Sequence, residues 1–451
     1  MPYTQTTWSS LQSSLQQRLD KPAQFYTNSG TYPEITLYLK EALRTWNCFA
    51  NRYRDRLTFN TTSGVAWYNL QTVTPTNPAT NFLARTVTDR DLVAEIQLHL
   101  LEPATPTAWS GTDMFTLADV VGNLQTTRDQ FMVDTGVEQL RTVAPLAIPV
   151  TGRFDMPQDV IDIRRLEWVS VAGVRSHLWK TDEWASQSYN PGWQSAGPTD
   201  PPSTYSTILT HPLGVQLIPY PAVPGQIDSL TVNSGATLNP VTPVLMGIPD
   251  DWAWAVKYGA MATLLSQENQ ARDPERARYC EQRYNDGINL ANLAPVIMRA
   301  QIDGVDVPVT SIHDLDSNNA GWPNLTPGTP TIVGISQYIL AVSPPPNAGP
   351  HSITVDVLRP APIPVLGTDF VTLGLEELDA ILDYAHHIAT FKEQGVEFKA
   401  TTHQYEEFIR LAATYNDRLN ANAFFREVLE NRSQVEQVMR PRVDPLGESR
   451  G

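Results

Sequence analysis

Hydrophobic residues recur at helical spacing through the first third of the chain. Between residues 35 and 53 they fall on one face of a helix, which predicts a strongly amphipathic helix. The residues Thr31-Tyr32-Pro33-Glu34 precede it and combine the spacing of a capping box with a proline at the helix start. A shorter stripe of leucines lies before this helix, at Leu11, Leu15 and Leu19.

Two further helices and a hairpin complete the predicted N-terminal region. The helices cover residues 89–101 and 116–133, and the second begins with a threonine and an aspartate at cap spacing and ends near a glycine. Residues 57–59 and 66–70 are short apolar runs separated by a polar turn sequence, which predicts a β-hairpin.

The pattern changes to β structure near residue 146. Residues 147–244 are rich in β-branched residues, proline and glycine, and residues 160–171 predict a strand that ends in a turn at Gly173. A second β-rich segment reaches residue 370. A pair of helices is predicted after each β-rich segment. The first pair consists of a helix that begins at residue 249 and one over residues 274–290, and the second pair covers residues 375–392 and 401–429.

One order of motifs occurs twice in the second half of the chain, over residues 171–293 and 301–424. Each copy has a short strand, a Gly-Trp step, a strand that ends in prolines, a β-branched run and two helices. The Gly-Trp steps are Gly192-Trp193 and Gly321-Trp322. This order predicts an internal duplication. Short β motifs and Pro-Gly turns also recur by chance, and the sequence leaves that alternative open.

The predicted fold class is α+β, with a helical bundle core, inserted small β-domains and a duplicated unit of a β-domain followed by a helix pair. The chain is expected to consist of an N-terminal helical region with a β-hairpin, a first β-domain, a first helix pair, a second β-domain, a second helix pair and an extended C-terminal arm. In that order, the parts cover residues 1–145, 146–247, 248–296, 297–372, 373–430 and 431–451. The arm lacks a sustained apolar stripe, and two prolines break any helix in it.

The charge of the chain argues against nucleic-acid binding. The formal net charge is -16, and no cluster of lysine and arginine is visible that would grip phosphate groups. No signal peptide opens the chain and no apolar run has membrane-spanning length, so we expect a protein that folds in a cytoplasm and has no membrane partner. Cys48 and Cys280 lie in predicted helices and are expected to be buried free thiols.

The sequence shows no recognisable catalytic or cofactor site. The common phosphate-loop, zinc and nucleophile-elbow motifs are absent. His386, His387 and Glu393 could be metal ligands, but adjacent histidines on a helix point about 100° apart, which favours polar residues on a helix surface or between subunits. Four aspartates in loop-like sequence could hold calcium, but the absence of EF-hand spacing favours a solvated turn. They are Asp303, Asp306, Asp314 and Asp316.

Tryptophans gather in the first predicted β-domain. Trp168, Trp179, Trp184 and Trp193 could form a platform on which sugars stack, but such residues more often anchor cores or subunit interfaces. Trp193 and Trp322 follow the matching glycines of the two copies, and we consider both as candidate interface aromatics.

Three groups of residues carry a resemblance to a known family. The opening segment contributes LQQRLD at 15–20, FYT at 25–27 and EITLYLKEALR at 34–44. The first β-domain contributes MPQDVIDIRR at 156–165 and LIPYP at 217–221. The first helix pair contributes IPDDW at 248–252 together with Asp273, Ala277, Tyr279 and Tyr284. In these residues the chain resembles the head-to-tail adaptor proteins of tailed bacteriophages.

The resemblance implies a structural virion protein, not an enzyme. Such adaptors form a homo-oligomeric ring, usually a dodecamer, that joins the portal protein to a tail or tail-nozzle protein and lines the DNA channel. It also implies a place in the virion neck, assembled in the host cytoplasm. An acidic ring fits this role, because it would repel a passing duplex and let it slide without sequence-specific binding.

The resemblance further implies that the C-terminal arm extends into the portal. A segment of this kind can become ordered on docking and bury apolar side chains against its partner. The candidate portal-binding residues are Val435, Val438, Met439, Arg440, Arg442 and Leu446.

The chain departs from the shorter adaptors by its helices over residues 89–133 and by its second unit of β-domain and helix pair. We therefore expect a taller or wider ring. An alternative hypothesis is a tail-peripheral or glycan-binding structural protein that presents Trp193 and Trp322 as matched stacking sites. A hydrolase of unfamiliar type is a third hypothesis, and it lacks a recognisable set of catalytic residues.

Overall fold

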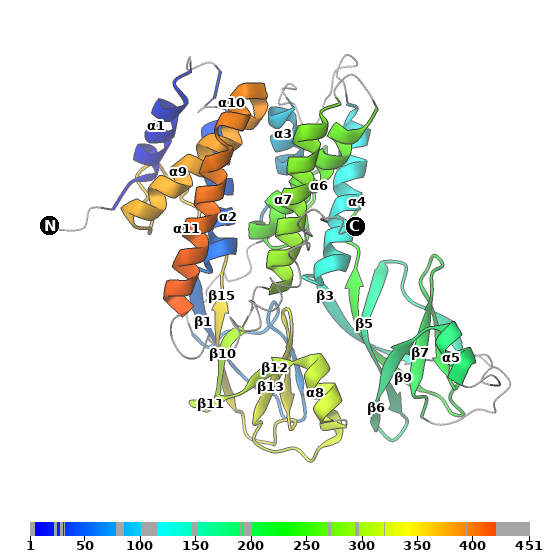
Figure 1. Ribbon diagram of the computed structural model, residues 1–451. Coiled ribbons are helices and arrows are strands. Elements are labelled where there is room, and N and C mark those ends of the chain that lie inside the picture. Colours follow the sequence, from blue (N-terminus) through cyan, green and yellow to red (C-terminus); the bar gives the residue numbers. More distant parts are fainter. Residues whose placement is uncertain are drawn as a thin grey trace, which may run out of the picture. The chain divides into compact units, whose positions relative to one another are not determined.

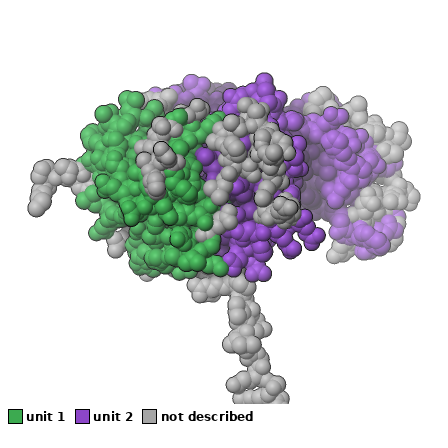
Figure 2. All heavy atoms as spheres, turned by 90° about the horizontal axis from the view of Figure 1, so that it is seen from above, with its two compact units in different colours: residues 1–52, 292–294, 361–451 green, residues 53–291, 295–360 purple. Residues whose placement is uncertain are grey.

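The chain forms two compact units. The computed structural model describes residues 5–21, 25–27, 30, 32–77, 85–100, 115–146, 152–189, 192, 201–268, 272–293, 297–319, 321–393 and 395–420. Unit 1 comprises residues 1–52, 292–294 and 361–451, and unit 2 comprises residues 53–291 and 295–360 (Figure 2). Among the described residues there are helices and three β-sheets, which confirms the predicted α+β class (Figure 1).

Unit 1 is helical. Its helices are α1 (Trp8–Leu19), α2 (Glu34–Ala50), α9 (Leu375–Thr390), α10 (Gly395–Ala400) and α11 (Thr402–Asn420), with the short 3-10 helix η3 (Phe391–Glu393) after α9. The predicted leucine stripe of α1 is buried, as is most of the apolar face of α2. Phe408 of α11 joins the helices, because its ring contacts Trp46 of α2 edge-on at 5.4 Å and stacks on Tyr384 of α9 at 4.3 Å between centroids.

The start of α2 differs from the predicted capping box. Pro33 occupies the N-cap position without a side-chain hydrogen bond, and Thr31 lies outside the described residues. The Glu34 carboxylate instead accepts a hydrogen bond from Lys392 at 2.8 Å and one from the backbone N–H of Thr27 at 2.9 Å. A buried ion pair within unit 1 therefore replaces the local cap.

Unit 2 contains the helices α3 (Asp89–His99), α4 (Leu117–Thr135), α6 (Ala253–Ser266) and α7 (Pro274–Leu293), except for the last two residues of α7. The 3-10 helix η1 (Asp250–Trp252) precedes α6. The predicted cap of α4 is confirmed, since Thr116 and Asp119 form a capping box and Gly136 ends the helix with φ of 63°. Helices α6 and α7 approach closely where small residues meet. A Cβ atom added at Gly287 would lie 2.3 Å from that of Ala255.

A seven-stranded sheet follows these helices in unit 2, in the order β3-β9-β5-β6-β7-β8-β4. Its strands are β3 (Gln139–Leu146), β4 (Arg153–Asp155), β5 (Val160–Ser170), β6 (Arg175–Thr181), β7 (Thr204–Ile208), β8 (Gly214–Ile218) and β9 (Gly225–Asn233). The short helix α5 (Glu183–Tyr189) lies between β6 and β7 in sequence. We call these strands and α5 the first β-module. Its core surrounds Trp168, and a Cβ at Gly225 would lie 2.4 Å from that ring.

Two four-stranded sheets form the second β-module, in the orders β1-β15-β10-β11 and β12-β13-β14-β2. The strands are β1 (Arg54–Asn60), β2 (Trp67–Asn69), β10 (Ile297–Ile302), β11 (Val305–Val307), β12 (Val309–Ser311), β13 (Ile332–Ser336), β14 (Ile339–Ser343) and β15 (Ser352–Leu358). Helix α8 (Ile312–Asn318) and the 3-10 helix η2 (Trp322–Asn324) complete this module.

The hairpin predicted over residues 57–59 and 66–70 is wrong. Strand β1 pairs with β15 and strand β2 pairs with β14, so the two runs belong to different sheets. Their pairing partners lie roughly 270 to 300 residues further along the chain, beyond the reach of a local hairpin pattern.

The two β-modules share one order of strand pairing. Strands β5 and β9 pair antiparallel and β3 adds to β9, just as β10 and β15 pair and β1 adds to β15. Strand β6 runs parallel to β7 and strand β12 runs parallel to β13. Finally, β8 lies between β7 and β4, as β14 lies between β13 and β2.

Candidate functional site

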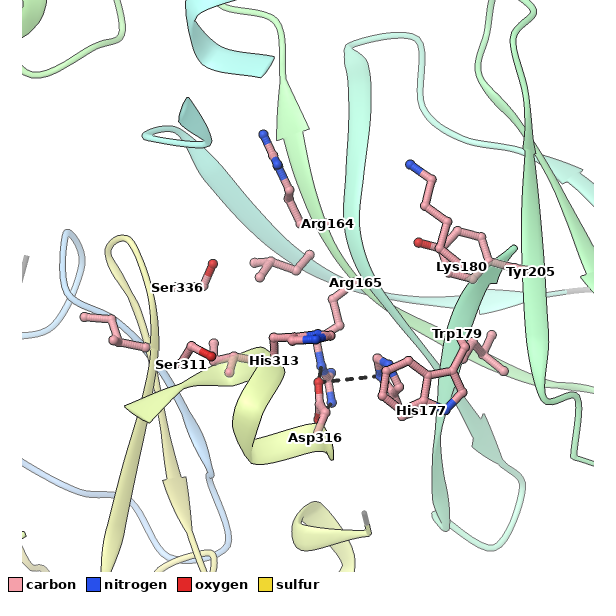
Figure 3. A pocket seen from close by; sticks show the side chains of 14 residues that line it. Arg164, Arg165, His177, Trp179, Lys180, Tyr205, Ser311, His313, Asp316 and Ser336 are labelled. Atoms are coloured by element: carbon pink, nitrogen blue, oxygen red, sulfur yellow. Dashed lines mark hydrogen bonds and ion pairs between the residues drawn. The ribbon is translucent and has the colours of Figure 1, made fainter. Parts of the chain in front are cut away.

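A cavity of about 390 Å³ lies where the two β-modules meet within unit 2 (Figure 3). Strands β5, β6 and β7 of the first β-module line one side, and α8 and β13 of the second line the other. The wall is mixed in character, since it includes charged side chains as well as Leu178, Ile312 and Ile335. The question is whether the charged groups are arranged for chemistry or for holding the modules together.

Arg165 and Asp316 form the central contact of this cavity. Arg165 donates two hydrogen bonds to the Asp316 carboxylate, from Nε at 2.6 Å and from Nη2 at 2.7 Å. Both side chains are almost fully buried, at 6% and 3% exposed. Burial alone would raise the pKa of Asp316, but the hydrogen bonds and charge of Arg165 outweigh it and hold that pKa below its ordinary value. The carboxylate is thus kept ionised by its partner.

Two further groups complete the surroundings of this pair. The indole N–H of Trp322 donates to Asp316 at 2.9 Å, and Arg165 Nη2 also donates to Glu167 at 2.6 Å. The guanidinium of Arg165 lies 4.9 Å from the ring centroid of Trp67, a cation–π geometry. Asp316 is therefore surrounded by donors, which is how a buried charge is tolerated.

His177 stands beside this pair on strand β6. Its Nδ1 lies 3.6 Å from an Asp316 oxygen, too far for a hydrogen bond (Figure 3). Burial lowers the pKa of His177, with a further lowering from Arg165, and the carboxylates of Asp316 and Glu167 only partly oppose this. The imidazole is consequently expected to be neutral at pH 7.

A second charged cluster lies next to the first. Asp228 on β9 accepts hydrogen bonds from both Arg141 and Arg175, and Arg175 also reaches Glu167 at 3.1 Å. Asn324 of the second β-module exchanges two hydrogen bonds with the backbone of Arg175, at 2.8 and 2.7 Å. The charges of this cluster therefore pair with one another within the first β-module, and Asn324 ties the cluster to the second, an arrangement that supports structure rather than catalysis.

A shallow hollow of about 540 Å³ lies over helices α4, α6 and α7. Small and polar side chains line it, among them Thr127, Thr263 and Ser266. A Cβ at Gly259 would lie 2.5 Å from Thr127, so the floor depends on this glycine. No set of nucleophile, base and acid converges in the residues that line this hollow.

The predicted interface aromatics have separate outcomes. Trp322 is completely buried, and its ring lies 5.3 Å from that of Trp67 between centroids. It therefore belongs to the interior of unit 2 and is not presented to a sugar or another subunit. Trp193 lies outside the described residues, as do the arm residues Val435, Val438, Met439, Arg440, Arg442 and Leu446.

The tryptophans of the first β-module do not form one platform. Trp168 is fully buried, Trp179 is 44% exposed and Trp184 is 85% exposed. A flat stacking surface needs neighbouring exposed rings, and Trp168 cannot contribute one.

The candidate metal ligands point to other partners. His387 is fully buried, accepts or donates a hydrogen bond with Thr401 at 2.9 Å and stacks on Phe398 at 4.8 Å, so a surface position is wrong for this residue. His386 instead contacts Gln404 at 2.9 Å, and Glu393 pairs with Lys21 at 2.9 Å. In the part of the chain that the structure describes, no three histidine, cysteine, aspartate or glutamate side chains converge as a metal site.

The four aspartates predicted as a solvated turn divide into two kinds. Asp303, Asp306 and Asp314 are exposed, and each pairs with a nearby residue: His351, Arg299 and Ser311, respectively. Asp316 contradicts the prediction, because it is buried against Arg165. The partner of Asp316 is Arg165, one of several charged residues in strand β5, and nothing in the local sequence connects residues 151 positions apart.

Two other sequence predictions can be compared with the described residues. Cys48 and Cys280 are buried and neither is in a disulfide, as expected, and burial raises the pKa of the Cys280 thiol. The helices among the described residues include none that is long and apolar enough to cross a membrane.

Comparison with protein families supports the resemblance found in the sequence. Residues 87–302 match the SU10 adaptor protein family. The match confirms the resemblance to phage head-to-tail adaptors and covers a little under half of the chain, from the residue before the α3 cap to the end of β10. It therefore includes α3, α4, α6 and α7 and the whole first β-module of this adaptor-like protein. Comparison with curated proteins gave no match.

Proposed function

We propose that the chain is a non-enzymatic structural subunit of a phage neck, which forms a ring that joins the portal to the tail and lines the DNA channel. The observation that carries this proposal is the match of residues 87–302 to the adaptor family. The helices of unit 1 and the second β-module, apart from β10, lie outside that match.

The charged groups in and beside the inter-module cavity support a structural role. Arg165, Asp316 and Asp228 are each used in contacts within unit 2. A catalytic centre would instead need a group held ready for a substrate. The net charge of -16 also fits a channel wall that does not hold DNA.

The partners follow from the proposed role. They are further copies of the chain, with twelve as the proposed ring number, the portal protein, and a tail or tail-nozzle protein. The arm over residues 431–451 is the proposed portal-binding segment, with the apolar Val435, Val438, Met439 and Leu446 as its contacts and Arg440 and Arg442 beside them. Trp193 stays a candidate interface residue.

The predicted duplication is part of this proposal. We propose a repeat that includes more strands and helices than the sequence motifs indicated. The shared strand pairing of the two β-modules supports a repeat that includes β1 and β2 in one copy and β3 and β4 in the other. Helix pairs precede these strands in both copies: α1 and α2 before β1, and α3 and α4 before β3. Helix pairs also follow both β-modules.

Matching details at the helix ends support the same assignment. Thr7 and Thr88 each cap a helix and each form an isolated antiparallel bridge, to Phe370 and Leu245. Helices α2 and α4 both end in a left-handed residue three positions before the next strand, Asn51 at φ 49° and Gly136 at φ 63°. Independent folds would have no reason to share these positions.

One adaptor unit is therefore proposed to be inserted into another. The outer copy of the repeat would comprise residues 7–69 and 297–420. The inner copy would comprise residues 88–293, which lie between those two segments in sequence. The family match, over residues 87–302, has nearly the same bounds as this inner copy. This arrangement accounts for strands β1 and β2 pairing with strands roughly 270 to 300 residues away.

The experiment that tests the proposed function is co-purification with the portal protein of the same phage. The full chain is expected to bind the portal as a multimer, and a variant that ends at residue 430 is expected to lose most of that binding while keeping its helical circular dichroism. A variant with alanine at Leu209, an exposed residue of the first β-module, serves as the control. Unchanged binding after removal of residues 431–451 would reject the arm as the portal contact.

A further inference from the structure

Helix α8 makes several of the contacts between the second β-module and the first. Asp316 of α8 binds Arg165 on β5, and His313 of α8 meets the ring of Trp179 on β6 edge-on, with centroids 6.1 Å apart. Ile312 and Leu315 pack in a cluster that includes Leu230 on β9. One face of this short helix is thus fully used within the chain.

Helix α5 is the counterpart of α8 in the first β-module. Both helices have seven residues and both follow a strand that runs parallel to the next one. Asp182 accepts the backbone N–H of Ala185 at 2.5 Å, and Ser311 accepts that of Asp314 at 2.9 Å, so both helices start from an equivalent capping residue. Counted from these caps, Trp184 occupies the position of His313.

The Trp184 side chain is unusually exposed for its type. It is 85% exposed, whereas tryptophan is highly buried on average. Its counterpart His313 contacts Trp179, which lies three residues before the cap of α5. The residue three positions before the cap of α8 is Pro308, and it is also exposed. The backbone supports this equivalence, since Pro308 O accepts the N–H of Val333 at the start of the parallel pairing of β12 with β13.

We propose that α5 of one copy of the chain packs on the second β-module of the next copy, with Trp184 against Pro308, as α8 packs on the first β-module within each chain. The inference rests on the proposed ring and on the proposed repeat. The two surfaces differ, so the contact is head-to-tail, the type that closes into a ring when the rotation permits. Around the ring, the contact of α8 within each chain would then alternate with the similar contact of α5 between neighbouring chains.

The character of the new contact differs from the internal one. Gln187 occupies the position of Asp316 when counted from the caps, so the buried ion pair has no equivalent. The large aromatic side chain of Trp184 would carry the contact instead, and tryptophan is one of the residues enriched among binding hot spots. Val305, which is 66% exposed on the same module, adds apolar surface near Pro308 in sequence.

Cysteine cross-linking of the assembled ring tests this contact. The double variant W184C/P308C is expected to give a ladder of covalent oligomers on oxidation, and a mixture of the two single variants is expected to stop at dimers. The control L209C/P308C moves one cysteine to another exposed position, 91% exposed, and should give no ladder. The native Cys48 and Cys280 are buried and should not contribute.

The outcomes separate this inference from the proposed function. A ring with a ladder supports both, and a ring without cross-links between residues 184 and 308 overturns the contact alone. A chain that stays monomeric with and without portal overturns the ring and the contact together. As a second readout, W184S should raise the concentration needed for assembly at least tenfold, whereas L209S should leave it unchanged. Equal assembly of W184S and the unaltered chain would also overturn the contact.

Discussion

Arg165 binds both carboxylate oxygens of Asp316, at 2.6 and 2.7 Å, although the two residues come from different β-modules. The pair is buried, so its separation would leave a charge without a partner in a poorly solvated place. This contact makes the modules of unit 2 dependent on each other. The same contact occupies the Asp316 carboxylate, which would otherwise be a candidate acid, base or metal ligand.

The first prediction concerns the two halves of this ion pair. Asp316→Ala should lower the free energy of unfolding by about 3–5 kcal/mol, because it leaves the Arg165 guanidinium buried without its main partner. The double variant R165M/D316L should lose much less, since it removes both charges and keeps apolar volume. Urea unfolding of the single and double variants measures this. A double variant as unstable as Asp316→Ala would contradict the interpretation.

The second prediction concerns the indole of Trp322. Trp322→Phe keeps an aromatic ring but removes the N–H that donates to Asp316, and it should cost about 1–3 kcal/mol of unfolding free energy. Leu209→Ala is the control, because that side chain is exposed and has no assigned partner, and it should change stability by less than about 0.5 kcal/mol. Equal effects in denaturant titrations would mean that the hydrogen bond of Trp322 contributes nothing measurable.

The third prediction concerns pH. Burial lowers the pKa of His177 below its ordinary value of 6.5. The unfolded chain therefore binds a proton more readily than the folded chain, and stability that is fully present above pH 6.5 is lost as pH falls below 6.5 towards the folded pKa.

His177→Gln should reduce this loss, because glutamine has no proton to gain. Urea unfolding at pH 7.5 and 5.5 provides the comparison, and the control His403→Gln removes an exposed histidine in unit 1. A pH dependence that is the same in His177→Gln and in the unaltered chain would show that another group is responsible.

The fourth prediction concerns the matching caps of α1 and α3. Thr7→Ala and Thr88→Ala each remove a side-chain oxygen that accepts a backbone N–H at a helix start. Each should cost about 1 kcal/mol, as is typical for an N-cap. Thermal unfolding followed by circular dichroism would measure both. An unchanged stability in either variant would weaken the proposed equivalence of these two positions.

The sequence allowed prediction of those parts of the fold whose causes are local. Helix α4 is an example, because Thr116, Asp119 and Gly136 specify its start and end within the helix itself. The leucines of α1 and the strand β5 are others. Periodicity, caps and turns depend only on nearby residues, which a single sequence displays.

The parts that could not be predicted depend on distant partners. The local sequence predicted that Glu34 belongs to a capping box, but its carboxylate binds Lys392. Asp316 fitted a solvated turn, but Arg165 buries it. Strands β1 and β2 fitted a hairpin, but their partners lie in the second β-module. In each case a contact across a long sequence separation outweighs a weak local preference.

The central claim is that this adaptor-like chain assembles into a ring and binds a portal. Native mass spectrometry of the full chain, alone and with the portal of the same phage, tests it most directly. We predict a closed homo-oligomer of the 50.1 kDa chain, with twelve copies as the expected number, bound to the portal. A chain that remains a monomer and never associates with the portal would contradict the account.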